Sequence, residues 1–263
     1  MSTTLSSSVQ TPSFLKLLTN DIRWKILVLL GRSDRCVQEI VRLLEQPPNL
    51  VSYHLRRLHD QKLVSERRST ADGRDIYYSL DVNMLRTLYF AAADSLNPAL
   101  NTIDVDSALQ EAVSHLSREK VRVLFLCTHN SARSQMAEGI LRHLIGGRIE
   151  AYSAGSQPSQ IHPLAVQVLA KMGIDISQQR SKHLDEFRSQ SFDYIVTVCD
   201  RVRESCPTFP GDPECVHWSF IDPVSVEGSD KERYKAFEQV ALQLTNRIRY
   251  LLILIEREQS GKK

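Results

Sequence analysis

One short stretch of the chain holds a cysteine and an arginine six residues apart, between a buried strand and a helix. Residues 121–126 are β-branched or large apolar residues, a run typical of a strand buried on both faces. Cys127 follows at once, then mostly small or polar residues up to Arg133 and Ser134, and from residue 135 the apolar spacing is helical. A loop between a strand and a helix N-terminus turns backbone amides into one concavity, which suits a tetrahedral oxyanion.

The residue types in this loop predict a nucleophilic cysteine. The guanidinium of Arg133 can bind two oxygens of an oxyanion at once. The same positive field is expected to lower the pKa of Cys127 and leave it a thiolate, the reactive form. The competing interpretation is a buried structural cysteine in front of a helix. The six residues expected to bind the oxyanion are Thr128, His129, Asn130, Ser131, Ala132 and Arg133.

Two further cysteines follow a second apolar strand, residues 192–198. Cys199 comes directly after it and Cys206 lies seven residues further on. Strands alternate with helices throughout residues 121–258, which predicts a doubly wound α/β domain with a four-stranded parallel sheet, whose ligands bind beyond the carboxyl ends of the strands. Because Cys127 and Cys199 both follow strand ends, we expect them to meet at one edge of the sheet. The other expected elements are strands at 148–154 and 216–218 and helices at 161–172 and 234–256.

Residues 11–96 predict a second domain, which is mostly helical. Its expected elements are helices at 12–30, 37–44, 50–61 and 81–95, and strands at 63–68 and 75–80. This order is that of a winged helix-turn-helix, whose second helix enters the DNA major groove while the hairpin reaches the backbone or minor groove. The competing interpretation is a protein-interaction module with solvated arginines. The candidate DNA-binding residues are Asn49, Ser52, Tyr53, Arg56 and Arg57 on the helix and Arg67, Arg68 and Arg74 on the hairpin.

Length and composition fit this two-domain organisation. The chain has 263 residues, and no apolar run approaches the roughly 18 residues that a membrane span needs. Residues 1–10 are rich in Ser and Thr and predict a disordered tail, not a signal peptide. Residues 97–120 predict an acidic linker with a short helix near 108–116. Five cysteines, an odd number in a chain too large to need disulfides, indicate catalytic thiols in a reducing cytoplasm.

Residues 121–258 resemble the low-molecular-weight protein tyrosine phosphatase superfamily. Within it, the run Thr-His-Asn-Ser-Ala-Arg-Ser-Gln-Met-Ala-Glu at 128–138 looks like the thioredoxin-coupled arsenate reductases. Cys199 and Cys206 have the spacing of the reductases' shuttle pair, and Asp222-Pro223 matches the superfamily's general acid. Eukaryotic phosphatases carry tyrosines after this Asp-Pro pair, whereas this chain has Val224-Ser225.

The resemblance implies that three thiols reduce arsenate in sequence. Cys127 would attack arsenate, with Asp222 protonating the leaving oxygen and Ser134 holding the thiolate. Cys199 would then attack Cys127 and expel arsenite, and Cys206 would move the disulfide to Cys199–Cys206 for reduction by a thioredoxin. The implied catalytic residues are Cys127, Arg133, Ser134, Cys199, Cys206 and Asp222. No bound cofactor is expected, and Cys215 has no assigned role.

The reductase family also has a potassium site. Asn130, Glu138 and Ser153 match three of its ligands. Lys182 stands where that site has an aspartate, and its ammonium group could replace the ion. We therefore expect no bound metal.

Residues 50–58, with Leu63-Val64 and residues 76–80, resemble the ArsR/SmtB repressors, which respond to arsenic and metals. The arsenite-sensing members carry a Cys-Val-Cys triplet where this chain has Cys36-Val37-Gln38. A single thiolate cannot hold a thiophilic ion strongly without partners. In these repressors the helix matching residues 81–95 packs across a dimer interface, so we expect a homodimer through the N-terminal domain. The alternative is a monomer with this face against the second domain.

The whole sequence predicts a cytoplasmic fusion protein. Its N-terminal domain, residues 11–96, would bind operator DNA, and its C-terminal domain, residues 121–258, would reduce arsenate with thioredoxin as the external reductant. Two alternatives stay open. One is a low-molecular-weight protein tyrosine phosphatase fused to a regulator; the other is a transcription factor whose second domain only binds an oxyanion or arsenite.

Overall fold

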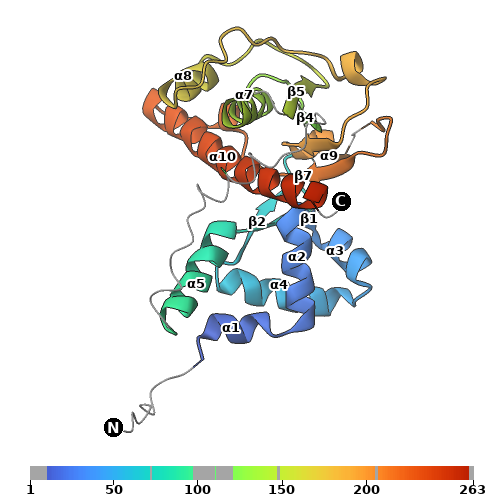
Figure 1. Ribbon diagram of the computed structural model, residues 1–263, viewed down its shortest axis with the longest axis vertical. Helices are drawn as coiled ribbons and strands as arrows, with labels where there is room; N and C mark the ends of the chain where they lie inside the picture. The colour runs from blue at the N-terminus through green and yellow to red at the C-terminus, as the bar shows by residue number, and fades with distance from the viewer. Residues whose placement is uncertain are drawn as a thin grey trace. The chain divides into compact units, whose positions relative to one another are not determined.

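The computed structural model describes residues 11–71, 73–96, 110, 121–146, 149–204 and 207–260 (Figure 1). The chain divides into two compact units, residues 1–103 and 104–263, each with its own hydrophobic core. The tail predicted at 1–10 lies outside the described residues. The linker helix predicted near 108–116 also does, apart from Gln110, which is helical. No helix in the described ranges is long and apolar enough to cross a membrane.

The N-terminal unit is a winged helix-turn-helix, as predicted. Its elements are α1 (Ser13–Leu18), α2 (Asp21–Arg32), β1 (Arg35–Cys36), α3 (Val37–Leu44), α4 (Pro48–Asp60), β2 (Val64–Arg68), β3 (Ile76–Leu80) and α5 (Val82–Asp94). The single helix predicted at 12–30 is wrong. Asn20 begins a new helix there, because its side chain accepts a hydrogen bond from the Arg23 amide at 3.2 Å. The two-residue strand β1 is too short to leave a sequence pattern.

The helix-turn-helix consists of α3 and α4. Glu45 ends α3 in the left-handed conformation, with a φ of 52°. Pro48 occupies the first turn of α4, where a missing backbone N–H costs nothing. The hairpin of β2 and β3 pairs Val64 with Leu80 and Arg68 with Ile76, and β1 adds antiparallel to β3. This hairpin is the wing.

The C-terminal unit is the predicted four-stranded parallel sheet with helices. Its elements are β4 (Val121–Cys127), α7 (Arg133–Ile145), β5 (Ile149–Gly155), α8 (Pro163–Lys171), η2 (Leu184–Phe187), β6 (Tyr194–Thr197), α9 (Asp200–Glu204), β7 (Glu214–His217), η3 (Pro223–Ser225) and α10 (Asp230–Ser260). The strand order is β5-β4-β6-β7, and every neighbouring pair is parallel. The direction of winding therefore reverses between β4 and β6, the point at which sheets of this kind bind ligands.

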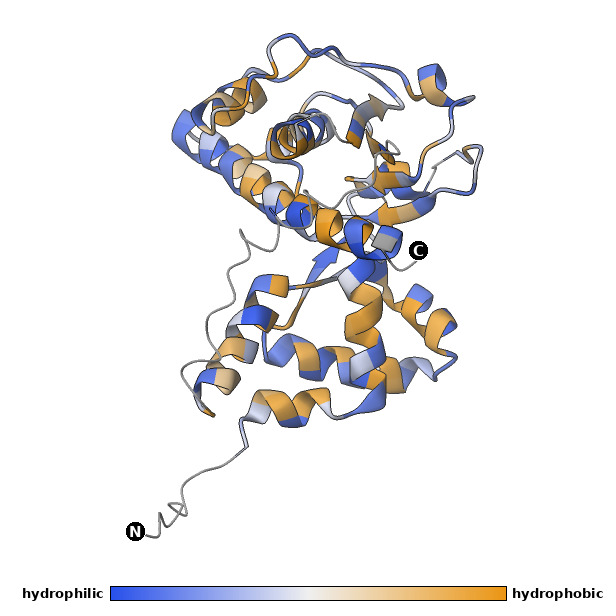
Figure 2. Cartoon of the chain, in the orientation of Figure 1, coloured by the Kyte–Doolittle hydropathy of each residue, from blue (hydrophilic) through white to orange (hydrophobic). Residues whose placement is uncertain are grey.

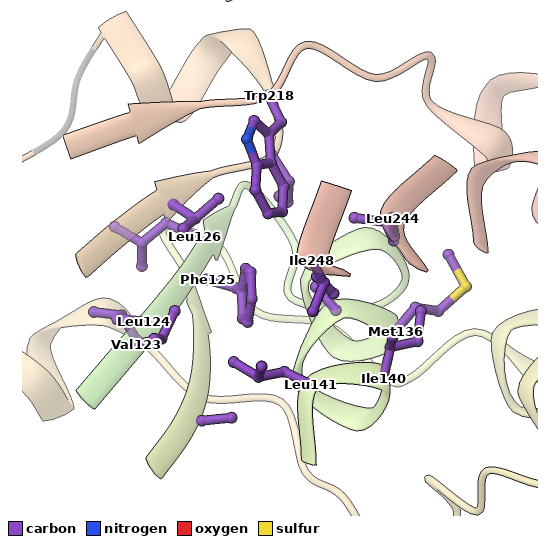
Figure 3. Close-up of a cluster of buried hydrophobic side chains, with 14 of the residues drawn as sticks. Val123, Leu124, Phe125, Leu126, Met136, Ile140, Leu141, Trp218, Leu244 and Ile248 are labelled. Carbon is purple, nitrogen blue, oxygen red and sulfur yellow. The ribbon is translucent and has the colours of Figure 1, made fainter. Parts of the chain in front are cut away.

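The two faces of this sheet are covered differently. On one face α10 packs against α7 and α8, and Phe125 of β4 lies among Trp218, Leu141 and Ile248 (Figure 3). Along α10, hydrophobic residues alternate with hydrophilic ones, as in a helix that covers a sheet (Figure 2). On the other face, four aromatic rings form a cluster. Tyr152, Phe187 and Phe192 contact one another, and Phe192 also contacts Phe209.

Phe125 holds this core close to the end of β4. Its side chain is fully buried, so Phe125→Ala would cost about 3–5 kcal/mol. The core therefore fixes the end of the strand from which Cys127 emerges.

Candidate active site

The loop after β4 is held from outside through its backbone carbonyls. Those of Thr128, His129 and Ser131 accept hydrogen bonds of 2.8–2.9 Å from backbone amides in the loop that follows β5. The carbonyl of Asn130 accepts one from the Ser181 hydroxyl at 2.6 Å. The amide of Asn130 points the other way, to the Cys127 sulfur, at 3.1 Å. With its carbonyls engaged elsewhere, this loop has the arrangement that an oxyanion-binding loop needs.

Two special backbone positions make the arrangement possible. Asn130 has a φ of 47°, in the left-handed region that asparagine tolerates better than most residues. Gly155, at the end of β5, lies so close to the loop that a Cβ atom there would be 2.5 Å from the Thr128 oxygen and 2.8 Å from the Asn130 nitrogen. Both neighbouring atoms belong to the backbone, so any side chain at Gly155 would push the loop away.

Cys127 is almost fully enclosed, with an exposed fraction of 3%. Its sulfur lies 2.8 Å from the Ser134 hydroxyl on the first turn of α7. Burial raises the pKa of the Cys127 thiol above its ordinary value and the neighbouring Cys199 raises it further, whereas Arg133 and the hydrogen bonds from Ser134 and Asn130 lower it. The prediction of a lowered pKa is therefore wrong for this conformation, because desolvation outweighs the positive field.

Arg133 faces a carboxylate. Its guanidinium donates to Asp222 Oδ2 at 2.7 Å and to the Phe220 carbonyl at 3.4 Å. The other oxygen of Asp222 accepts from the Val224 amide at 3.1 Å, so the carboxyl group is fixed at both ends. Asp222 comes from the chain after β7 and Arg133 from α7, yet the fold brings them into contact. The structure thus places the predicted anion-binding group and the predicted acid side by side.

A buried hydrogen-bond network joins the Cys127 loop to α7 and β5. The Asn130 side-chain amide donates to Ser134 Oγ at 2.9 Å and to Ser153 Oγ at 2.8 Å. Ser153 donates in turn to Glu138 Oε2, which also lies 3.2 Å from the ammonium of Lys182. Both Glu138 and Lys182 are buried.

The network does not fit a bound potassium ion. Lys182 already supplies a positive charge to Glu138 Oε2, and Arg142 binds the other oxygen of Glu138 at 2.6 Å. A second cation at this carboxylate would meet two positive groups at short range. Among the described residues, no group of three or more His, Cys, Asp or Glu side chains is arranged to hold a metal.

Cys199 lies beside the same loop. It is 2% exposed, and its sulfur is 3.4 Å from the Thr128 hydroxyl. The register of β4 and β6, which pairs Leu126 with Thr197, brings the two strand ends together at the point where winding reverses. Cys206 is outside the described residues. Cys215 is exposed on β7, which β6 separates from β4.

In the N-terminal unit, α4 separates its residues into two faces. Val51, His54, Leu55 and Leu58 are buried, whereas the five candidate DNA-binding residues of the helix are exposed: Asn49, Ser52, Tyr53, Arg56 and Arg57. On the wing, Arg68 and Arg74 are exposed. Arg67 is only half-exposed, and its guanidinium donates to the Arg68 carbonyl at 2.7 Å.

Cys36 has a local structural role. It caps the start of α3, where its amide donates to the Glu39 carboxylate at 3.1 Å. Burial raises the pKa of its thiol, which disfavours the thiolate that a soft ion needs.

Three further residues support the loop through contacts that the sequence did not predict. Gln135 donates to Asn130 Oδ1 at 3.0 Å, Ser181 holds the Asn130 carbonyl, and Gly155 allows the close approach. Only Gly155 left a signal, as a glycine directly after a strand. The other two act across 5 and 51 residues, respectively.

Two family models match the chain. Residues 122–261 match low molecular weight phosphotyrosine protein phosphatase, and residues 20–66 match the arsR family of bacterial regulatory proteins. An arsenate reductase of Halalkalibacterium halodurans is 41% identical over 127 residues, 48% of this chain and 91% of that protein. An arsenate reductase of Shouchella clausii is 40% identical over 129 residues, again 48% and 91%. Among solved structures, a thioredoxin-dependent arsenate reductase of Corynebacterium glutamicum aligns with 89% of this chain and 98% of its own, at 24% identity and a TM-score of 0.43.

Proposed function

The chain belongs to the low molecular weight phosphotyrosine protein phosphatase family, and we propose that it is an arsenate reductase of that family fused to an ArsR-type DNA-binding domain. The observation that carries reduction over phosphate-ester hydrolysis is the buried Cys199, whose sulfur lies 3.4 Å from Thr128 of the oxyanion loop. A phosphatase needs one nucleophilic thiol, whereas a reductase needs a second thiol within reach of the first.

In the first step the Cys127 thiolate attacks arsenic. Arsenate enters the loop of residues 127–133, and Arg133 exchanges its bond to Asp222 for the oxygens of the substrate. The hydrogen bonds from Ser134 and Asn130 stabilise the thiolate. Asp222 acts as the general acid and gives a proton to the departing hydroxyl of arsenate, which leaves as water. A bond between the Cys127 sulfur and arsenic(V) takes the place of the broken arsenic–oxygen bond.

The second step transfers two electrons. The Cys199 thiolate attacks the Cys127 sulfur, and the sulfur–arsenic bond breaks with its electron pair remaining on arsenic. Arsenic(V) becomes arsenic(III) and leaves as arsenite, while the two thiols become a Cys127–Cys199 disulfide. The Thr128 hydroxyl, beside both the loop and Cys199, can hydrogen-bond the attacking sulfur.

The third step moves the disulfide to Cys199–Cys206, where a dithiol protein such as thioredoxin reduces it. Five of the six residues between these cysteines form α9. Five helical residues rise about 7.5 Å along the helix axis, whereas the two Cα atoms of a disulfide lie about 4.4–6.8 Å apart. We therefore expect α9 to unwind at least in part when this disulfide forms.

The N-terminal domain would place this enzyme on DNA. The exposed face of α4 carries two arginines and three polar or aromatic side chains suited to base edges and phosphates. We expect a homodimer that reads two half-sites, with residues 97–120 as the linker to the reductase domain. Arg56→Ala and Arg57→Ala should each weaken operator binding, measured by fluorescence anisotropy at fixed salt, while Arg42→Ala, an exposed arginine on α3, serves as the control.

The deciding assay is arsenate-dependent oxidation of NADPH in the presence of thioredoxin and thioredoxin reductase. Steady turnover by the wild type and one arsenite per chain by Cys206→Ser would support the three-thiol reductase. Hydrolysis of a phosphotyrosine ester that survives in Cys199→Ser, without arsenate turnover, would favour the phosphatase. Stoichiometric oxyanion binding without either reaction would favour a sensor.

A further inference from the structure

A fully buried carboxylate–imidazole pair lies directly after Cys199. Asp200 and His217 are both 0% exposed, and Asp200 Oδ1 is 3.2 Å from His217 Nε2. The hydroxyl of Ser219 donates to the same carboxylate oxygen at 3.0 Å. The three steps of arsenate reduction use none of these groups. Burying a carboxylate is costly unless it is paired and hydrogen-bonded, so a specific role for this one is expected.

The imidazole joins the ends of two strands to the start of α9. His217 is the last residue of β7, and its Nδ1 lies 2.9 Å from Thr197 Oγ1 at the end of β6. With its proton on Nε2, His217 donates to Asp200 and accepts from the Thr197 hydroxyl, so both ring nitrogens of His217 have a partner. Asp200 is the first residue of α9. The pair therefore attaches this short helix to the sheet.

We infer that Asp200 is a positioning residue for Cys199, an inference that rests on the proposed reductase function. The peptide that joins Cys199 to Asp200 is fixed on one side by β6 and on the other by the Asp200–His217 contact. This restraint holds the Cys199 sulfur beside Thr128 and the Cys127 loop.

The anchoring itself can be measured without arsenate. Hydrogen exchange of the amides in residues 200–204, followed by mass spectrometry, should be at least about tenfold faster in Asp200→Ala than in the wild type. Glu204→Gln is the matched control, because it removes an exposed carboxylate from the same helix. Exchange at the wild-type rate in Asp200→Ala would overturn the inference.

Positioning is then separated from general structural damage in a Cys206→Ser background. Asp200→Ala should form the Cys127–Cys199 disulfide at least about tenfold more slowly after one addition of arsenate, while its Kd for inorganic phosphate changes less than about twofold. Asp200→Asn keeps an oxygen that can accept from His217 and Ser219, and it should restore most of the rate. A matching loss of phosphate affinity, or an unchanged disulfide rate, would contradict a positioning role.

These outcomes are distinct from failure of the proposed function. If the Cys206→Ser parent forms no Cys127–Cys199 disulfide with arsenate, the reductase assignment fails. The positioning of Cys199 for that reaction then fails with it, whereas the exchange data would still report whether Asp200 anchors α9.

Discussion

Two segments follow neighbouring parallel strands in the C-terminal unit, and they are held in opposite ways. After β4, four successive carbonyls of the Cys127 loop accept hydrogen bonds from other segments, and Gly155 packs against the loop backbone. After β6, the segment that begins at Cys199 is a five-residue helix, anchored at its first residue by His217 and Ser219. The first segment is a loop held through successive carbonyls, and the second is a short helix held at its first residue by two side chains.

The difference fits the proposed roles of the two thiols. In the proposed mechanism Cys127 reacts with an anion whose oxygens must meet fixed donors, so its surroundings should not change during the reaction. In the same mechanism Cys199 attacks Cys127 first and then pairs with Cys206, so its surroundings would have to rearrange. Short elements with few buried contacts open most easily.

The largest expected effect is loss of the nucleophile in the fixed segment. Cys127→Ser should abolish arsenate turnover, because an alcohol at neutral pH is far less nucleophilic than a thiolate. Cys215→Ser is the control, since that exposed cysteine should leave the rate within about twofold. Turnover lost equally in both variants would contradict the assignment of Cys127.

The next effect concerns the acid that faces Arg133. Asp222→Asn should lower the arsenate turnover rate by about 100- to 10,000-fold, as loss of a general acid does. The affinity for inorganic phosphate, measured by calorimetry, should not weaken, because Asp222 no longer competes for Arg133. Glu227→Gln, an exposed carboxylate five residues away, should behave as wild type. Weaker phosphate binding in Asp222→Asn would show that Asp222 supports the anion site instead.

A smaller effect should follow from loss of one hydrogen bond to Cys127. Ser134→Ala removes a donor that lowers the pKa of this thiol, so the pKa should rise further. Because the thiolate is the reactive form, the pH profile of Cys127 alkylation should move to higher pH. The rate at pH 7 should fall about 10- to 100-fold, equivalent to the roughly 1.5–3 kcal/mol of a hydrogen bond to a charged group. A profile that stays in place would mean that Ser134 does not act on the thiolate.

Removal of the Lys182 ammonium, the cation beside Glu138, should change the arsenate turnover rate several-fold. Lys182→Met leaves the buried Glu138 paired with Arg142, and disruption of a buried pair costs about 3–5 kcal/mol of folding free energy. Turnover should become dependent on potassium, compared in potassium and choline chloride, whereas the wild type and the exposed control Lys235→Met should not respond. Equal potassium dependence in all three proteins would contradict the hypothesis that the Lys182 ammonium takes the place of a potassium ion.

The smallest effect is on stability at alkaline pH. Burial raises the folded-state pKa of Cys127 above that of the unfolded chain, so the unfolded state loses this proton first as pH rises. The stabilisation is present below about pH 8.5 and is lost as pH rises toward the folded-state pKa. Between pH 8 and 10 the Tm of the wild type should therefore fall by more than that of Cys127→Ser. Parallel curves would argue against a raised pKa.

The sequence could predict the fold and the loop that follows β4 because their signals are local. A change from a strand pattern to a helical one around Cys127, Arg133 and Ser134 is visible within 20 residues. The protonation state of Cys127 could not be predicted, because it depends on burial and on Cys199, which is 72 positions away. Asp200 and His217 are 17 positions apart on different elements, and only the sheet register brings them together. Asn20, in contrast, offered a visible helix-start signal before Asp21 that the apolar spacing concealed.

Gly155 shows how little room separates a working site from a displaced one. The hydrogen atom of this residue faces two backbone atoms of the Cys127 loop, and a methyl group in its place would overlap both. Gly155→Ala would therefore leave the cores of both units unchanged and still shift the amide that faces the Cys127 sulfur. The position of the Cys127 sulfur relative to its hydrogen-bond donors thus depends on the absence of a side chain at Gly155 on the neighbouring strand.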